Sequence, residues 1–295
     1  MPMNKTLFLL GYASDIAGAG RGSAKGPILL KQSPYLSELS EQGLTLHWQT
    51  LVKSPYHEKL VLPEVVKLCG QLATEVAREV REKHFFTVLG GDHTSAIGTW
   101  SGAAMVKKEE GPIGLIWIDA HMDSHTPETS LSGNIHGMPL ACLLGHGDTS
   151  LTYLTGDAPK LYPEHVCLVG VRSYEEHEAD LLNQLNIRIF YMDEVKQRGL
   201  TAVFQDALQI ATTGTCGYGL SVDVDSIDPS DAPGTSVAEA DGLSAEELCQ
   251  SLTLFADDPR LLGFEIAEFD PSRDIHHQTE KVITHLISAI TLGKF

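Results

Sequence analysis

The sequence predicts an α/β fold in which a mostly parallel sheet is covered by helices on both faces. Short apolar runs rich in β-branched residues alternate with longer amphipathic stretches, a pattern typical of a parallel sheet buried on both sides. No internal repeat, low-complexity tract or long Pro/Gly-rich linker interrupts this alternation. A chain of 295 residues could hold one or two domains, and without a linker we expect a single domain over residues 1–295.

Seven apolar runs are the expected strands. They are residues 6–11, 85–89, 113–119, 165–171, 187–191, 217–224 and 261–266. Two stretches between them carry apolar residues at three- and four-residue spacing, which predicts helices over 62–82 and 244–256. The second stretch begins with Ser244, followed three residues later by Glu247, and this pairing marks a capped helix start.

The composition narrows the classes of partner. A formal net charge of -18 argues against nucleic acid and anionic membranes, because both attract basic surfaces. No apolar run approaches the roughly 20 residues of a membrane span, and the N-terminus shows neither a basic leader nor a small-residue cleavage site. We therefore expect a cytoplasmic protein. The five scattered cysteines lack metal spacing and are expected to be buried, reduced thiols.

A glycine-rich segment at residues 18–27 has neither of the spacings that bind nucleotide phosphates. It is expected to be an ordered surface loop.

Acids and histidines follow three of the expected strands. The run "GLIWIDAHMD" ends in Asp119, His121 and Asp123, and alternate residues of an extended chain point the same way. A second strand ends in Asp223 and Asp225. The carboxyl ends of strands are where open α/β sheets place their ligands.

The third segment, "FFTVLGGDHTS", delivers Asp92 and His93 after a Gly-Gly turn. Singly, such acids often cap the next helix, and a lone histidine usually satisfies a local hydrogen bond. Together they would concentrate buried charge at high cost unless cations compensated it. The candidate metal ligands are His93, Asp119, His121, Asp123, Asp223 and Asp225.

The chemistry of these ligands narrows the metal. Carboxylates outnumber imidazoles and no thiolate takes part, which favours a cation such as manganese over a structural zinc. Six side chains are too many for one four-coordinate ion and enough for two, and a two-metal site activates water near neutral pH.

Three blocks, "GGDHTS", "DAHMD" and "SVDVDSIDP", resemble the signatures of the ureohydrolase superfamily, which includes arginase, agmatinase, guanidinobutyrase and formimidoylglutamase. The resemblance covers nearly the whole chain. It implies a three-layer α/β/α sandwich with two Mn²⁺ ions, bridged by Asp119 and Asp223, and hydrolysis of a small guanidino or amidino compound. It also implies a homo-oligomer, a trimer or a hexamer.

Further residues take their expected roles from the same resemblance. The loop "SGNIHGMP" is similar to the arginase loop that binds the amino-acid end of arginine, which makes Ser130, Ser132 and Asn134 candidate carboxylate ligands. His136 resembles the proton-shuttling histidine and Glu268 the glutamate that orients the guanidinium; with Asp123 they form the expected catalytic group.

Three positions depart from the arginase pattern. His125 replaces an asparagine that binds the substrate carboxylate, and Glu175 replaces the aspartate that receives the α-amino group. Glu239 lies in a rewritten turn that lacks the usual "GTPVVGG". The leading hypothesis is hydrolysis of L-arginine to L-ornithine and urea. The alternatives are a formimidoylglutamase, a guanidino-acid hydrolase, an agmatinase, or a metal-binding sensor or scaffold without catalysis.

Overall fold

A single eight-stranded sheet organises the protein in the computed structural model, which describes residues 5–18, 22–53, 61–156 and 159–295. The strand order is β2-β1-β3-β8-β7-β4-β5-β6, and every neighbouring pair is parallel. The strands are β1 (Lys5–Ala13), β2 (Leu44–Lys53), β3 (Phe86–Gly90), β4 (Gly114–Ile118), β5 (Val166–Val171), β6 (Arg188–Tyr191), β7 (Tyr218–Asp223) and β8 (Leu261–Ala267).

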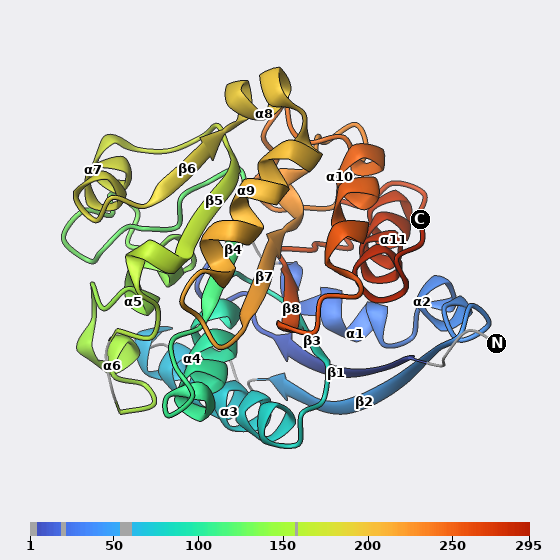
Figure 1. Cartoon of the computed structure of the whole chain (residues 1–295), viewed down its shortest axis with the longest axis horizontal. Helices are drawn as coiled ribbons and strands as arrows, with labels where there is room; N and C mark the ends of the chain where they lie inside the picture. Colours follow the sequence, from blue (N-terminus) through green and yellow to red (C-terminus); the bar gives the residue numbers. More distant parts are fainter. Residues whose placement is uncertain (1–4, 19–21, 54–60, 157–158) are drawn as a thin grey trace.

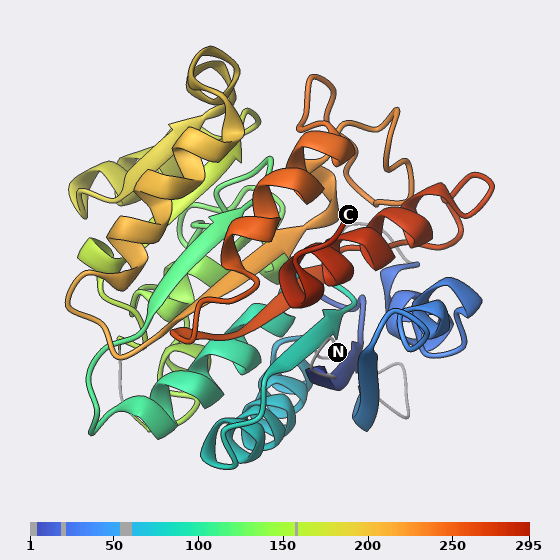
Figure 2. The same ribbon diagram turned by 45° about the vertical axis from the view of Figure 1, so that its right-hand side comes forward.

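Helices cover both faces of this sheet, as Figures 1 and 2 show. The longer ones are α3 (Val61–Arg81), α4 (Ser95–Lys107), α7 (Glu176–Gln184), α9 (Leu200–Thr212), α10 (Ala245–Leu252) and α11 (Gln278–Leu292). The shorter ones are α1 (Gly26–Leu30), α2 (Pro34–Glu38), α5 (Pro139–Leu143), α6 (Thr149–Thr152) and α8 (Met192–Arg198). None of the helices in the described residues is both long and apolar enough to cross a membrane.

Two hydrophobic cores lie on opposite faces of the sheet. Successive side chains of a strand point to opposite sides, so in β4 Leu115 and Trp117 pack with α3 and α4, whereas Ile116 and Ile118 pack with α9, α10 and α11. Each such buried side chain contributes about 1.5–3 kcal/mol. The expected α/β/α sandwich is confirmed, and all of its strand pairs are parallel.

The seven strands β1 and β3–β8 begin and end within two residues of their expected bounds, and α3 begins and ends one residue before its expected bounds. The Ser244 hydroxyl caps α10 as expected, although α10 ends at Leu252, where a 3₁₀ turn continues to Phe255. Strand β2 was missed. It pairs only with β1 at the sheet edge and exposes alternate residues, so it lacks a continuous apolar run.

The glycine-rich segment 18–27 is not a plain surface loop where the structure describes it. A 3₁₀ turn covers Ser23–Lys25, and α1 begins at Gly26. Gly22 and Gly26 are buried, and a β-carbon at either would lie within 2.6 Å of an atom of Asp270 or Phe269. The two glycines therefore allow the 3₁₀ turn and the start of α1 to pack closely against the loop that follows β8. Residues 19–21 of the segment lie outside the described residues.

Candidate metal centre and substrate cavity

The candidate ligands converge at the carboxyl ends of three strands, β3, β7 and β4, and Glu268 joins them from β8, which lies between β3 and β7. His93 follows β3, Glu268 follows β8, Asp223 ends β7 and Asp119 follows β4. Parallel strands end at the same edge of the sheet, so residues far apart in the sequence meet there. This placement agrees with the expectation from the sequence.

The local backbone differs from the extended chain that we expected after β4. The strand ends at Ile118, and Asp123 has a left-handed backbone with φ of 48°. Asp119 Oδ1 accepts a hydrogen bond from the His121 N–H at 2.7 Å, and Asp223 Oδ1 accepts one from the Asp225 N–H at 2.8 Å. In both motifs the aspartate side chain accepts a hydrogen bond from the backbone N–H two residues later, and this contact turns the chain. The side chains converge because the backbone turns, which corrects the extended-chain argument.

His93 forms the buried side of the cluster. Its Nδ1 lies 3.0 Å from Asp123 Oδ2, 3.0 Å from Asp223 Oδ2 and 3.3 Å from Asp119 Oδ2. The imidazole ring stacks on Trp117 at a centroid distance of 4.2 Å, and Trp117 Nε1 donates to Asp119 Oδ2 at 2.8 Å. The aromatic contact fixes the plane of the ring, so Nδ1 is held toward the carboxylates.

A chain of buried hydrogen bonds supports Nε2, the other ring nitrogen of His93. His93 Nε2 lies 3.0 Å from Ser221 Oγ, and Ser221 Oγ donates to Glu265 Oε2 at 3.2 Å. The second oxygen of Glu265 accepts from the Ser95 hydroxyl. Ser221, Glu265 and His93 are fully buried, and burial raises the pKa of Glu265 above its usual range.

His121 forms the more open side of the cluster. Its Nδ1 lies 3.1 Å from Asp225 Oδ2 and 3.5 Å from Asp119 Oδ1. Its side chain is 23% exposed, whereas that of His93 is 1% exposed. His121 therefore borders the cavity that opens onto the cluster.

Divalent cations fit this arrangement of donors. The ligand atoms of His93, Asp119 and Asp223 lie within 4.8 Å of one another, as do those of Asp119, His121 and Asp225. Asp119 belongs to both groups. His93 Nδ1 is buried and faces three carboxylates without a well-directed hydrogen bond, so it is suited to bind a metal ion.

The pKa values of two carboxyl groups in the metal-free cluster also favour bound cations. Burial and the neighbouring Asp119 raise the pKa of Asp123 to about 7. Burial and then Asp225 raise the pKa of Asp223 well above its usual range. Carboxylates this crowded cannot all ionise unless positive charge is added. Cations at the two groups would supply that charge.

Asp92, the acid beside His93, belongs to neither group. Its carboxylate accepts from the N–H groups of Ala17 and Thr94, at 3.2 Å each, and burial raises its pKa to about 6. Asp92 therefore links the segment that follows β1 to the turn that carries His93.

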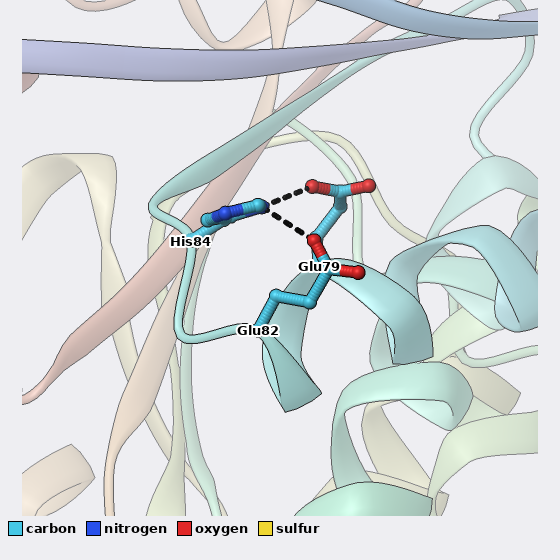
Figure 3. Close-up of side chains that lie close together, drawn as sticks. All are labelled: Glu79, Glu82 and His84. Atoms are coloured by element: carbon cyan, nitrogen blue, oxygen red, sulfur yellow. Dashed lines mark hydrogen bonds and ion pairs between the residues drawn. The ribbon is translucent and has the colours of Figure 1, made fainter.

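A separate His/Glu group lies at the C-terminal end of α3 and contains Glu79, Glu82 and His84 (Figure 3). Both oxygens of Glu79 already have partners, Arg78 Nε at 3.1 Å and His84 Nδ1 at 2.8 Å. The His84 ring stacks on Phe8, with ring centroids 3.7 Å apart. These contacts explain the group as a structural link between the end of α3 and strand β1.

A cavity of about 330 Å³ opens directly onto the cluster. It brings together the expected substrate-binding and catalytic side chains with part of the metal cluster. Its lining includes His121, Asp123, His125, Ser130, Ser132, Asn134, His136, Glu175, Asp223, Asp225, Glu239 and Glu268. Among the described residues, the lining includes no lysine or arginine.

Glu268 and His136 form a pair at the floor of this cavity. Glu268 Oε1 accepts from the His93 N–H at 2.9 Å and lies 3.2 Å from His136 Nδ1. Burial alone would lower the pKa of His136, but the hydrogen bond and charge of Glu268 outweigh it and raise the pKa to about 9. His136 is therefore protonated at neutral pH in the metal-free protein.

The serine loop forms one wall of the cavity. Ser130 Oγ accepts from the Gly133 N–H at 3.0 Å, and Ser132 Oγ accepts from the Asn134 N–H at 3.2 Å. The two hydroxyl oxygens also lie 3.4 Å apart, so one of them donates to the other, and the remaining hydroxyl hydrogen is available to a ligand.

His125 and Glu175 also line the cavity. His125 Nδ1 is 3.1 Å from Thr129 Oγ1, and its Nε2 is 3.6 Å from Glu175 Oε2 and 3.5 Å from Glu178 Oε2. Glu175 is also the N-cap of α7, in a reciprocal capping box with Glu178. Glu175 therefore positions α7 in addition to facing the cavity.

Three residues that support the site were not expected from the sequence: Ser221, Glu265 and Arg172. The first could have been found, because a serine two residues before Asp223 on a buried strand must point to the same side as that ligand. Arg172 donates to five main-chain carbonyls, those of Gly170, Asp225, Ser226, Glu239 and Ala240.

Comparisons with known proteins agree with this architecture. The Arginase family profile matches residues 5–293. The arginase of Bacillus subtilis strain 168 is 37% identical over 99% of both chains, and that of Bacillus caldovelox is 36% identical over 97% and 98%. A crystal structure of the Bacillus subtilis arginase superposes with a TM-score of 0.91 at 36% identity, covering 99% of both chains.

More distant structures share the fold. An arginase from Entamoeba histolytica, in complex with L-ornithine, has a TM-score of 0.89 at 27% identity over 98% of this chain and 99% of the other. A formimidoylglutamase from Bacillus subtilis has a TM-score of 0.78 at 22% identity, which shows the fold alone. From the profile match and the relatives above 30% identity, the chain belongs to the arginase family.

Proposed function

We propose that this protein hydrolyses L-arginine to L-ornithine and urea, with two manganese ions held by the His93 and His121 groups. The observation that carries this proposal is the cavity, in which His121, Asp123 and Asp225 face the same space as His136 and Glu268. The arginase relatives support the choice of substrate.

The residues assigned to the metals are His93, Asp119, Asp123 and Asp223 on the buried side and Asp119, His121, Asp223 and Asp225 on the open side. The sharing of Asp119 between both groups supports its bridging role, and bridging by Asp223 stays a prediction. Oxygen-rich donors favour manganese. When bound, the cations would lower the pKa of a water molecule toward neutrality.

Glu268 and His136 would act on the guanidinium group. A carboxylate accepts paired hydrogen bonds from a guanidinium, and Glu268 is held in place by the His93 N–H. In the metal-free protein Glu268 outweighs burial and raises the pKa of His136 to about 9, and a protonated His136 would donate to the nitrogen that leaves as the ornithine amine.

The cavity walls would bind the amino-acid end. Ser130, Ser132 and Asn134 offer neutral donors for the substrate carboxylate, and His125 Nε2 adds a ring nitrogen in the same cavity. Glu175 would accept from the α-amino group. Together these neutral and acidic side chains would recognise the amino-acid end of the substrate.

We further propose that residues 1–295 act as one domain, and that the protein is a cytoplasmic homo-oligomer, a trimer or a hexamer. The free state of all five cysteines supports a reducing compartment. The oligomeric proposal rests on the resemblance to the superfamily, and light scattering of the purified protein measures it.

A substrate screen tests the function. Protein loaded with two manganese ions per chain is incubated with L-arginine, agmatine, guanidinobutyrate or formimidoylglutamate, and both urea and formamide are measured. The proposal expects the highest kcat/KM for L-arginine. A higher value for another compound overturns the substrate assignment, and no product from any of them indicates a metal-binding sensor or scaffold.

A further inference from the structure

Glu239 is an acidic residue of the cavity to which the proposed function gives no role. It belongs to the turn that replaces the usual arginase sequence, and its side chain is 34% exposed. Glu239 Oε1 lies 3.7 Å from His121 Nε2. This is an ion-pair distance, and a small rotation of the half-exposed side chain would bring it within hydrogen-bond range.

His121 needs an acceptor on this side when a metal is bound. Its Nδ1 faces Asp119 and Asp225 and is therefore the metal-facing nitrogen. The neutral ring then carries its hydrogen on Nε2. Metal-binding histidines nearly always donate that N–H to a carboxylate, carbonyl or water, which fixes the ring and raises its basicity.

Arg172 fixes the position of Glu239 relative to the metal group. Its Nη2 donates to the carbonyl of Asp225 at 2.7 Å and to that of Glu239 at 2.8 Å. The same guanidinium donates to the carbonyls of Ser226 and Ala240 at 3.1 and 2.9 Å. The backbone that carries the ligand Asp225 and the backbone that carries Glu239 are thus bound to one side chain.

We propose that Glu239 is a positioning residue of the metal centre, which accepts the Nε2 hydrogen of His121 and orients its Nδ1 toward the cation. The proposal rests on the two-metal centre of the proposed function. His93 does not need Glu239, because its Nε2 is already supported by Ser221 and Glu265. Glu239 therefore acts on one of the two metal groups.

Metal affinity tests this assignment without any substrate. Free Mn²⁺ is measured by electron paramagnetic resonance during titration of the metal-free full chain and of Glu239→Ala and Glu239→Gln. Loss of a partner of this kind typically costs 10–100-fold in metal affinity. We expect Glu239→Ala to weaken one of the two sites by about tenfold and to leave the other unchanged, and Glu239→Gln, which keeps an acceptor, to weaken it less.

Asp241→Asn is the matched control. Asp241 lies in the same turn, its side chain is 86% exposed, and its carboxylate faces Lys196 at 3.7 Å. Its φ of 61° suits asparagine. This variant removes the same charge without touching His121, so both manganese affinities should match those of the wild type. An equal loss of manganese affinity in Asp241→Asn and Glu239→Gln would show that only the change in net charge matters, and it would overturn the proposal.

Thermal unfolding separates positioning from folding. Glu239→Ala should unfold at the wild-type temperature without metal and show a smaller rise on addition of Mn²⁺. Equal manganese affinities in Glu239→Ala and wild type, or an equal loss of stability with and without metal, would overturn the proposal. Neither result bears on urea release, whereas a fully loaded protein that releases no urea would refute only the proposed function.

Discussion

The two histidines of the metal cluster show how one centre can combine a rigid side with an open side. The His93 ring is buried, stacked on Trp117 and backed by Ser221 and Glu265. The His121 ring is partly exposed, borders the cavity and faces Glu239 across 3.7 Å. The core thus determines the orientation of one ligand, and a surface turn determines that of the other.

This difference separates two kinds of constraint on the sequence. A change on the His93 side disturbs packing as well as metal binding, because every neighbour is buried. A change on the His121 side reaches the metal with little effect on the core, so the sequence of the turn that carries Glu239 can vary more freely. Both sides meet at Asp119.

The largest effect is expected at this shared residue. Asp119→Ala removes a carboxylate that belongs to both groups, so both manganese ions and all turnover should be lost. Asp225→Ala removes a member of the His121 group alone and should retain one tightly bound ion. Metal analysis after gel filtration measures both. Two ions per chain in Asp119→Ala would contradict the shared assignment.

The next effect compares the two histidines in the metal-free protein. His93→Ala leaves a cavity beside Trp117 and removes the partner of three buried carboxylates, so it should lower the free energy of unfolding by about 3 kcal/mol. His121→Ala, at the cavity border, should cost about 1 kcal/mol. Urea unfolding in the presence of a chelator gives both values. Equal losses would show that the two sides do not differ in rigidity.

A smaller effect is expected at Ser221. Ser221→Ala removes the contact to His93 Nε2 and a donor to Glu265, so manganese affinity at one site should fall about tenfold. The metal-free protein should lose about 1 kcal/mol as well, in contrast to Glu239→Ala. Manganese titration and urea unfolding of both variants test this contrast, which fails if Ser221→Ala leaves the metal-free stability unchanged.

A pH dependence of the stability is expected at His136. The folded protein raises the pKa of His136 from 6.5 to about 9, because Glu268 outweighs the effect of burial. The resulting stability is fully present below pH 6.5 and is lost as the pH rises through 9. The difference in unfolding free energy between the metal-free wild type and His136→Asn should therefore shrink from pH 6 to pH 9.5. A constant difference would show that His136 gains no proton on folding.

The sequence predicted the fold well because apolar runs report burial on both faces. Strand β4 was visible for this reason, and Asp119 at its end indicated the metal side of the sheet. Strand β2 was not, because it pairs on one side only and exposes alternate residues. The run of residues 44–53 carries polar side chains that a central strand would not tolerate.

The clustering of the candidate ligands was predictable, whereas the residues that support them were not. The spacing of Asp119 and His121 predicted that their side chains converge, and they do, but an aspartate turn replaces the expected extended chain. The role of Arg172 could not be read from the sequence, because its acceptors are main-chain carbonyls from distant turns. Such contacts leave no mark on the residue types of their partners.

The position of Trp117 gives the protein a built-in optical reporter. Its indole stacks on His93 and donates to Asp119, so it lies against two candidate ligands of the paramagnetic Mn²⁺ ion. Binding of that ion should quench its fluorescence. With Trp48 and Trp100 replaced by phenylalanine, the remaining emission would follow occupation of the buried side of the centre in real time, before any substrate is added.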